Sequence, residues 1–381
     1  MKKILFVIHE LEYTGSPRST LRMCKVALNL GYDVSVWSMK DGPFVEEFNS
    51  RNIEVRIVDH TVIHKKEWVK LIKTYDMAIC NTIITDSYVR ILCRYIPTVW
   101  YIREAGNISK HVKNNPQRRY MLRYFNNICS VSAYAAKEIR KYTKKKVQII
   151  HNCVEDESDK ASEYVVGTNN KVRFTQFGTL IDRKGYDVLF DAFESLPADY
   201  QDKAELYFAG SYSDNSYAKS ILQRSEDNSQ IHYLGVLKGD DKTKRLSEMD
   251  VVIVASRDES CSLVVLEGAM LSKPLIVTEN VGAKYMVKTD NGCIVKTDDS
   301  ESLMRALKYM IDNKDKLAEM GKRSRRYYDK KANMKMYTQE MKDLFKECDK
   351  KSKLSFVFKC LFNRFWTSNR LIKYVSKHGN V

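Results

Sequence analysis

Two carboxylates stand close together in the stretch SRDESCSLVVLEGAMLSKP, residues 256–274, with seven residues between them. Glu267 falls within an apolar run of helical length, and Glu259 precedes that run. On a helix, Glu267 shares a face with four apolar residues, Leu263, Val264, Met270 and Leu271. Because an unpaired buried charge is costly, Glu267 requires a basic side chain, a hydrogen-bond donor or the hydroxyls of a ligand.

Cations and glycine backbone occur together in a second stretch, RFTQFGTLIDRKGYDVLFDAF, residues 173–193. Gly178 follows a predicted strand, and Arg183 and Lys184 directly precede a predicted helix. Exposed glycine backbone with two cations at a helix start suits an anionic group such as a diphosphate. Since many such loops contain a lysine by chance, a plain surface charge is the alternative for Lys184. After the first strand, Gly15 similarly leaves room for a ligand to approach.

Several other chemistries lack their motifs. There is no GxGxxG fingerprint, and the only Gly-Lys pair, at 321–322, lacks the other residues of a P-loop, which disfavours nicotinamide enzymes and P-loop ATPases. No GxSxG, HExxH or clustered Cys/His set is present, so hydrolase triads and zinc sites are not supported. The acidic pairs at 240–241 and 298–299 are interpreted as solvated acids at helix starts. No metal site is therefore expected.

The residues of the stretches 173–193 and 256–274 must be positioned by regular elements. The sequence contains short apolar runs separated by stretches of helical length. They are KILFVI, DVSVWS, IEVRIV, DMAIC, TVWYI, NICSVS and VQIIH in the first half, and VRFTQFG, AELYFAG, IHYLG, DVVIVAS and PLIVT in the second. This alternation predicts parallel sheets covered by helices on both faces. The polar segment 154–171 between the two series is the best candidate for a linker. The fold class is therefore α/β, with two doubly wound, Rossmann-like domains that bind ligands at the carboxyl ends of their strands.

The expected domains are residues 1–160, residues 161–350 and a C-terminal tail, with the last helix before the tail a candidate to pack back on the first domain. A chain of 381 residues with 44% hydrophobic and 29% charged residues suits two soluble globular domains. The first apolar run is shorter than the core of a signal peptide, and no stretch approaches the length of a membrane span. Nine cysteines without a CxxC pair indicate reduced thiols and a cytoplasmic location.

The tail, residues 351–381, contains seven lysines and arginines and no acid, out of a net charge of +16. Its basic residues alternate with aromatic and aliphatic ones, which predicts a helix lying on an anionic membrane surface. A terminal helix packed on the body is the alternative. The basic stretch 110–125 adds to the membrane hypothesis. A nucleic-acid partner is not expected, because no nucleic-acid-binding motif accompanies these charges.

The two acids and the segments around them, DVVIVASRDES and LEGAMLSKPLIVT, resemble the signature of glycosyltransferase family 4, the glycogen-synthase-like transferases of group 1. The resemblance continues through Gly15, IHNCVE, FGTLIDRKG, YLGVLKGDDK and NVGAKYMVKTDNGCIV, and covers the chain to about residue 345. It implies the GT-B architecture of two facing Rossmann-like domains, with a nucleotide-diphosphate sugar bound in the cleft.

The resemblance also implies a role for each matching residue. Glu267 is expected to bind the ribose hydroxyls, Glu259 the transferred sugar, and Lys184 the diphosphate. The other expected donor-binding residues are Gly15, Gly178, Thr179, Arg183 and Leu237, together with backbone N–H groups of Ser260, Cys261, Ser262 and Leu263. Leu237 corresponds to the position that holds the base, and Gly15 closes over the diphosphate from the first domain. Glu259, Lys184 and Arg183 are the expected catalytic groups.

The sequence departs from the family pattern at three places. Thr179 stands where an arginine commonly follows the glycine of the diphosphate loop, and Arg183 is expected to replace that charge. On the acceptor side, Arg103, followed by Glu104, stands where the family often has a histidine. These two residues are interpreted as acceptor-binding groups or, alternatively, as a structural ion pair. Cys261 and Ser262 replace the usual aromatic residue and glycine after the first acid.

The resemblance thus predicts a retaining, metal-independent transferase without a bound cofactor. It would transfer a sugar from a nucleotide-diphosphate sugar to a glycan or lipid-linked saccharide at the cytoplasmic face of a membrane, in cell-surface polysaccharide synthesis. The alternative from another class is a non-catalytic partner of GT-B fold that binds a glycan or another transferase. An epimerase or phosphorylase of the same fold is a weaker alternative among enzymes.

Overall fold

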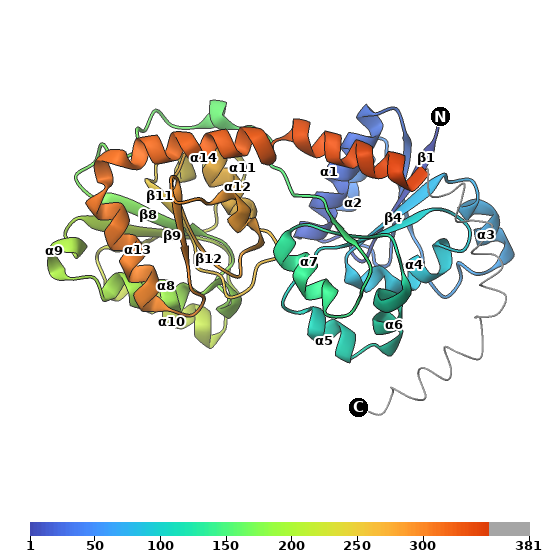
Figure 1. Cartoon of the computed structure of the whole chain (residues 1–381), viewed down its shortest axis with the longest axis horizontal. Helices are drawn as coiled ribbons and strands as arrows, with labels where there is room; N and C mark the ends of the chain where they lie inside the picture. The colour runs from blue at the N-terminus through green and yellow to red at the C-terminus, as the bar shows by residue number, and fades with distance from the viewer. Residues whose placement is uncertain (350–381) are drawn as a thin grey trace. The chain divides into compact units, whose positions relative to one another are not determined.

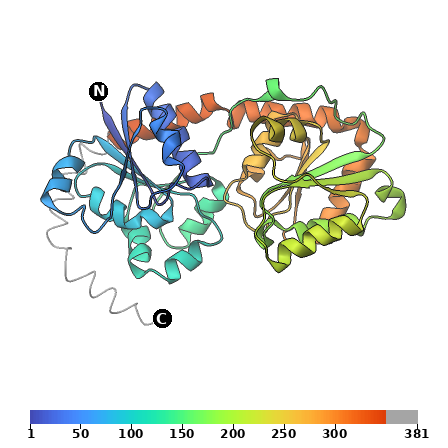
Figure 2. The same cartoon turned by 180° about the vertical axis from the view of Figure 1, so that it is seen from behind.

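The computed structural model describes residues 1–349, which divide into two compact units (Figures 1 and 2). Unit 1 comprises residues 1–150 and 338–349, and unit 2 comprises residues 151–337. Each unit contains one sheet in which every strand pairing is parallel. The predicted class, two doubly wound α/β domains, is confirmed. The tail for which a membrane-surface helix is predicted lies outside the described residues.

Unit 1 has seven strands in the order β3-β2-β1-β4-β5-β6-β7. They are β1 (Lys3–Ile8), β2 (Asp33–Ser38), β3 (Glu54–Ile57), β4 (Met77–Asn81), β5 (Thr98–Ile102), β6 (Ile128–Ser130) and β7 (Val147–Ile149). The α-helices between them are α1 (Gly15–Asn29), α2 (Val45–Asn49), α3 (Lys66–Ile72), α4 (Asp86–Leu92), α5 (Ile108–Lys113), α6 (Pro116–Tyr124) and α7 (Ala133–Arg140).

Unit 2 has six strands in the order β10-β9-β8-β11-β12-β13. They are β8 (Val172–Phe177), β9 (Ala204–Ala209), β10 (Ile231–Tyr233), β11 (Val251–Val254), β12 (Leu275–Thr278) and β13 (Gly292–Val295). The α-helices are α8 (Tyr186–Glu194), α9 (Ala198–Gln201), α10 (Ser216–Asp227), α11 (Gly239–Ser247), α12 (Leu263–Met270), α13 (Ser300–Asp312) and α14 (Leu317–Lys331). Helices α8 and α13 pack together on one face of the sheet, and α12 and α14 on the other (Figure 1).

Every predicted apolar run forms a strand. The central strands are the most apolar, because a parallel strand covered on both faces has no solvent-facing side. All residues of β4, β5, β11 and β12 are buried. Strand β13 was not predicted. It lies at the edge of its sheet and leaves Ile294 50% exposed, so its apolar run is short and carries a weak signal.

The strand orders place a topological switch point in each unit. In unit 1 the chain moves outward from β1 to β3 and then returns to pair β4 with β1. In unit 2 it moves outward from β8 to β10 and then returns to pair β11 with β8. Ligands of open parallel sheets bind beside the carboxyl ends of the strands at such points. The loops after β8 and β11 are therefore the first place to look for a site in unit 2.

The last described helix, residues 334–349, begins in unit 2 and continues into unit 1. In unit 1 it buries Met341, Leu344 and Phe345, and the ring of Phe345 lies edge-on to Tyr32, 5.3 Å away. Within residues 1–349, no helix combines the length and the apolar composition that crossing a bilayer requires.

The polar segment 154–171 belongs to unit 2, and the two units divide after Ile150. Its later part is held by Asp250, a fully buried residue directly before β11. The Asp250 carboxylate accepts hydrogen bonds from the Tyr164 hydroxyl at 2.7 Å, the Gly167 N–H at 2.7 Å and the Arg173 N–H at 2.8 Å. This segment is thus fastened to the sheet rather than being a free linker.

Replacing this carboxylate should destabilise unit 2. Asp250→Ala leaves three donors without their acceptor, so we expect the free energy of unfolding to fall by about 3 kcal/mol. Urea unfolding of the purified variants measures it. Asp214→Ala, at a position whose side chain is 78% exposed, is the matched control and should unfold like the wild type. Equal stability of the Asp250 variant would show that the carboxylate does not anchor the segment.

Candidate functional site

The loops after β8 and β11 meet at the switch point of unit 2 in close backbone contact. Gly185 has φ of 64°, and a Cβ at this position would lie 2.3 Å from the carbonyl oxygen of Ala255. The Arg257 N–H donates to the Arg183 carbonyl at 2.8 Å. Only glycine combines this left-handed backbone with the absence of a side chain. The two loops therefore have a fixed register.

The side chain of Gln176, a buried residue of β8, joins the same two loops. Its Nε2 donates to the carbonyl of Lys184 at 2.9 Å, and its Oε1 accepts from the N–H of Ala255 at 2.7 Å. Each half of the amide is used, and each bonds a different loop. The positions of Lys184 and of the segment that leads to Glu259 are thus set from the core of the sheet.

This register brings the three predicted catalytic residues together. The ammonium of Lys184 is ion-paired with Oε2 of Glu259, and the guanidinium of Arg183 lies 3.0 Å from the same oxygen. Lys184 and Glu259 are largely buried, with side chains 16% and 17% exposed, whereas Arg183 is 44% exposed. Two cations and one carboxylate leave one net positive charge in a partly desolvated position. Such a group is suited to an anion such as a diphosphate.

The Lys184 side chain also covers the glycine at the end of β8. A Cβ at Gly178 would lie 3.4 Å from Cε and 3.7 Å from Nζ of Lys184, so the ammonium stands directly over this backbone. Gly210, which follows β9, approaches closely as well, because a Cβ there would lie 1.7 Å from the Gly178 carbonyl oxygen. Thr179 is exposed, with its hydroxyl 3.5 Å from that of Ser211. Gly178 and Lys184 therefore form one surface, and their role in binding a diphosphate remains a prediction.

The backbone of Glu259 is held by the loop after β12. Its N–H donates to the carbonyl of Asn280 at 3.2 Å, and its carbonyl accepts from the N–H of Gly282 at 2.7 Å. The next residues lead into the first turn of α12, with Cys261 and Ser262 buried and Leu263 half-buried as the first helical residue. The backbone of residues 260–263 thus lies at the amino end of a helix, where N–H groups point outward.

The structure identifies a partner for Glu267. Lys242 of α11 donates to both carboxylate oxygens, at 2.7 and 2.5 Å. Glu267 was expected to lie on the apolar face of its helix, away from solvent. Its side chain is partly buried, at 21% exposed, because this side of α12 faces α11 and solvent rather than the sheet. Of the three ways to satisfy this carboxylate, a basic side chain is the one present. Lys242 was not predicted as a site residue.

Arg257 is a second residue that the sequence did not single out. Its guanidinium bonds both oxygens of Asp187, at 2.9 and 2.6 Å, and its Nε lies 2.6 Å from Asp298. The hydrogen bonds to Asp187 raise the pKa of Arg257 further above its ordinary value. Asp298, interpreted as a solvated acid at a helix start, is 54% exposed and stands just before α13, and it is also ion-paired with Arg257. Arg257 follows a buried strand and precedes Glu259 by two residues, and that position was the available signal.

The remaining predicted residues are on other elements. Leu237 is half-buried in the loop between β10 and α11, and this loop leads into the helix that contains Lys242. Gly15 is the exposed first residue of α1 in unit 1, with no atom within 4 Å of where its Cβ would stand. Its role at the donor remains a prediction. Within residues 1–349, no group of three His, Cys, Asp or Glu side chains is arranged to hold a metal ion.

Arg103 and Glu104 follow β5 in unit 1. The Glu104 carboxylate accepts from the backbone N–H of Ile83 at 2.9 Å and from that of Arg103 at 3.0 Å, and burial raises its pKa above the ordinary value. Arg103 lies over the ring of Tyr101, with 5.2 Å between the guanidinium carbon and the ring centroid. Glu104 therefore fastens the loop after β4 to the loop after β5.

The loop held by Glu104 contains a strained residue. Thr82, directly after β4, has φ of 83°, which is unfavourable for a β-branched side chain. Its hydroxyl lies 3.2 Å from Nδ1 of His9, the residue after β1, whose pKa burial lowers. Strands β1 and β4 are the pair at the switch point of unit 1, so the strain occurs where this unit is expected to bind its ligand.

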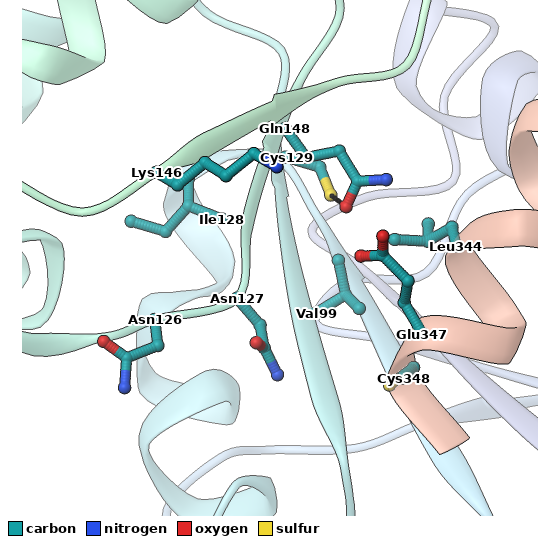
Figure 3. A pocket seen from close by; sticks show the side chains of 10 residues that line it. All are labelled: Val99, Asn126, Asn127, Ile128, Cys129, Lys146, Gln148, Leu344, Glu347 and Cys348. Atoms are coloured by element: carbon teal, nitrogen blue, oxygen red, sulfur yellow. Dashed lines mark hydrogen bonds between the residues drawn. The ribbon is translucent and has the colours of Figure 1, made fainter. Parts of the chain in front are cut away.

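A small cavity of about 70 Å³ in unit 1 lies elsewhere (Figure 3). Its walls come from residues just before or at the start of β5, β6 and β7, including Asn127 and Lys146, and from Leu344 and Glu347 of the terminal helix. It therefore lies toward the amino ends of the strands, away from the switch point. We assign it no part in the site.

The two halves of the chain match two family models. The model described as "Glycosyl transferases group 1" matches residues 160–327, and that described as "Glycosyl-transferase family 4" matches residues 1–157. The first covers the switch point of unit 2, with Lys184, Glu259 and Glu267. The second covers the sheet of unit 1.

Curated relatives are similar over part of their length. An uncharacterized glycosyltransferase of Methanocaldococcus jannaschii is 24% identical over 59% of this chain and 62% of its own. The GDP-mannose-dependent monoacylated alpha-(1-6)-phosphatidylinositol monomannoside mannosyltransferase of Corynebacterium glutamicum is 27% identical over 39% of this chain and 40% of its own. The chain thus spans less than two thirds of the length of these relatives.

The fold matches solved structures over nearly the whole chain. The crystal structure of Anabaena HepE in complex with UDP superimposes with a TM-score of 0.78 and 17% sequence identity, covering 91% of this chain and 100% of that one. At this identity the similarity establishes the architecture. The architecture is that of GT-B proteins.

The Lys242–Glu267 contact should be energetically coupled. Both side chains are less than one third exposed, so we expect Lys242→Met and Glu267→Gln to lower the free energy of unfolding non-additively, with a coupling of about 1 kcal/mol. A double-mutant cycle by urea unfolding measures it. The matched cycle on Lys219 and Asp214, whose side chains are 67% and 78% exposed, should show no measurable coupling. Additive losses at the first pair would contradict the contact.

Glu104 should make stability depend on pH. Because its folded-state pKa is raised, the folded protein holds this proton more tightly than the unfolded chain. The resulting stabilisation is complete below the ordinary value of 4.5 and is lost as pH rises through the raised pKa. Glu104→Gln keeps an acceptor oxygen but does not ionise. Its free energy of unfolding should therefore increase relative to the wild type between pH 4 and pH 7, measured by denaturant unfolding, and a constant difference would contradict this.

Proposed function

Because this chain belongs to the family 4 glycosyltransferases, we propose that it transfers a sugar from a nucleotide-diphosphate sugar to a glycan or lipid-linked saccharide, with retention of anomeric configuration. The observation that carries the proposal is the cluster of Lys184, Arg183 and Glu259 at the switch point of unit 2. It combines cations for a departing diphosphate with a carboxylate for a sugar, on loops whose register is fixed.

The reaction develops negative charge on the diphosphate and positive character at the anomeric carbon as the bond between them breaks. Lys184 and Arg183 stabilise the first charge, and because their loop is already positioned, little reorganisation is needed. The amino end of α12 and the backbone N–H of Thr179 supply further donors to the phosphates.

Binding of the diphosphate would exchange ionic partners. In the structure both cations are neutralised in part by Glu259. Phosphate oxygens compete for the same N–H groups, so the Glu259 carboxylate becomes available to the hydroxyls of the transferred sugar and to the developing positive charge. Arg257, held by Asp187 and Asp298, keeps its place during this exchange.

The nucleoside part of the donor is assigned to the other side of α12. Glu267 accepts hydrogen bonds from the ribose hydroxyls, and Lys242 orients its carboxylate. Leu237 contacts the base, and Gly15 of unit 1 completes the diphosphate site. In the proposed step the acceptor hydroxyl attacks from the face of the leaving group, which retains the configuration. The bond from the acceptor oxygen to the anomeric carbon forms, the bond to the diphosphate breaks, and the diphosphate accepts the hydroxyl proton. In this scheme neither a metal ion nor a histidine base takes part.

The acceptor is proposed to be membrane-associated, and the reaction to occur at the cytoplasmic face as part of cell-surface polysaccharide synthesis. The mannosyltransferase of Corynebacterium glutamicum supports this, since its name describes a phosphatidylinositol acceptor. The basic composition of residues 351–381 supports contact with an anionic membrane surface. Arg103 and the strained loop at Thr82 lie at the edge of unit 1 proposed to receive the acceptor.

The purified protein should recognise one class of donor. Among UDP-, GDP-, dTDP-, ADP- and CMP-sugars, one is expected to raise the melting temperature, because a ligand of the native state stabilises it. Glu267→Gln should abolish the shift. Lys184→Met should lower the rate of nucleotide release about 10²- to 10³-fold, as expected for loss of a cation at the leaving group.

Lys219→Met is the matched control, since Lys219 is a 67% exposed lysine of the same unit, and it should retain full activity. If no donor raises the melting temperature and no turnover is measured with membrane extracts as acceptor, the chain is a binding partner of GT-B fold and not a transferase.

A further inference from the structure

An open pocket of about 450 Å³ in unit 1 is built by α5, α6 and the turns beside them. Its walls contain three amide side chains, one imidazole and two cations: Asn107, Asn114, Asn115, His111, Lys110 and Arg118. No carboxylate and no aliphatic side chain lines it. A pocket of donors without an acid selects for an anion, and its volume is that of a small-molecule site.

Arg118 forms the fixed wall of this pocket. It is 9% exposed, and its Nε and Nη2 donate to Oδ1 of Asp86 at 3.0 and 2.7 Å. Its Nη1 donates to the carbonyl of His111 at 3.2 Å. Three of the five guanidinium N–H groups thus hold the side chain in place. A guanidinium held in this way binds an oxyanion with little further loss of side-chain entropy.

The pocket is electrostatically positive. Burial lowers the pKa of His111, and the charges of Arg118 and Lys110 lower it further. The charged and titratable groups that act on His111 are Lys110 on its own helix, Arg118 on α6 and His9 after β1. Two acids accompany them: Asp86 on α4 is bonded to Arg118, and Glu10 lies 3.4 Å from Nε2 of His9. The nine-residue α6 begins here, with Asn115 as its N-cap, and adds the positive end of its dipole.

The position of the pocket connects it to the acceptor. Helix α5 begins six residues after the end of β5, and the loop between them contains Arg103 and Glu104. The pocket therefore adjoins the carboxyl edge of the unit 1 sheet, the edge to which the proposed function assigns the acceptor. An anionic group bound here would be part of a molecule that reaches the same edge.

We propose that this pocket binds a phosphate or diphosphate group of the acceptor, through Lys110, His111 and Arg118. The proposal rests on the proposed function for the identity of the ligand, but the pocket itself is tested without turnover. The phosphate comes either from a soluble or lipid-linked sugar phosphate or from the head group of an anionic lipid, and both present the same oxyanion to these side chains.

The test is a pH titration of His111 by NMR of side-chain-labelled histidine, on the full-length Lys184→Met variant to weaken binding at the donor site. His111→Gln identifies the resonance. Inorganic pyrophosphate should raise the pKa of His111 in a saturable manner. Lys110→Gln should weaken pyrophosphate binding about tenfold, the loss of one charge-assisted contact. Lys113→Gln, on the same helix but outside the pocket, should bind as before.

Vesicles distinguish the two sources. A response of His111 to pyrophosphate in solution supports a sugar phosphate. A response only to phosphatidylglycerol vesicles, and not to phosphatidylcholine vesicles, supports a lipid head group. If neither changes the His111 titration, or if the Lys110 and Lys113 variants bind equally, the inference is wrong. If the protein turns over a donor but neither pyrophosphate nor vesicles change the pKa of His111, this inference is wrong and the proposed function still holds.

Discussion

The carboxyl edge of the unit 2 sheet is held together by one buried amide, that of Gln176. Its oxygen and nitrogen bond the backbones of Ala255 and Lys184, on two loops that are 70 residues apart in the chain. Gly185 allows these loops to touch. The ion pairs of Arg183 and Lys184 with Glu259 depend on this register, because long charged side chains on unconnected loops would lose rotamer entropy to meet. The chemistry of the site is therefore positioned from the core outward.

Much of the fold was predictable because parallel strands buried on both faces appear in the sequence as continuous apolar runs. Strand β13 was not predicted, because it has only four residues and leaves Ile294 exposed, so it contains no long apolar run. Lys184, Arg183 and Glu259 were predictable as loop residues after β8 and β11, since strand order makes those loops neighbours. The Lys242–Glu267 contact was not, because it depends on how α11 lies beside α12. Hydrophobic periodicity orients α12 on its sheet but carries no information about the charge that a neighbouring helix presents.

Both glutamates of the signature are neutralised by lysines, and the two pairs have different consequences. In the pair at Glu259, the carboxylate oxygen bonded to Lys184 is also bonded to Arg183, so a stronger anion finds two cations already close together, one of them largely buried. In the pair at Glu267, both carboxylate oxygens are bonded to the ammonium of Lys242 and to no second cation in the described residues. Pairing lowers the cost of holding a partly buried charge until a ligand arrives. The first arrangement favours exchange of partners, and the second favours a fixed acceptor for hydroxyl groups.

The return of the last described helix to unit 1 has a consequence for how the protein is made. Residues 151–337 of unit 2 are continuous, so every contact within that unit is available once its own segment has been synthesised. Unit 1 is synthesised first, yet its partner for Tyr32 is Phe345, more than three hundred residues later. Its sheet must therefore leave the ribosome with an apolar surface uncovered. Among the described residues, unit 1 is thus begun first but is completed only after all of unit 2 has been synthesised.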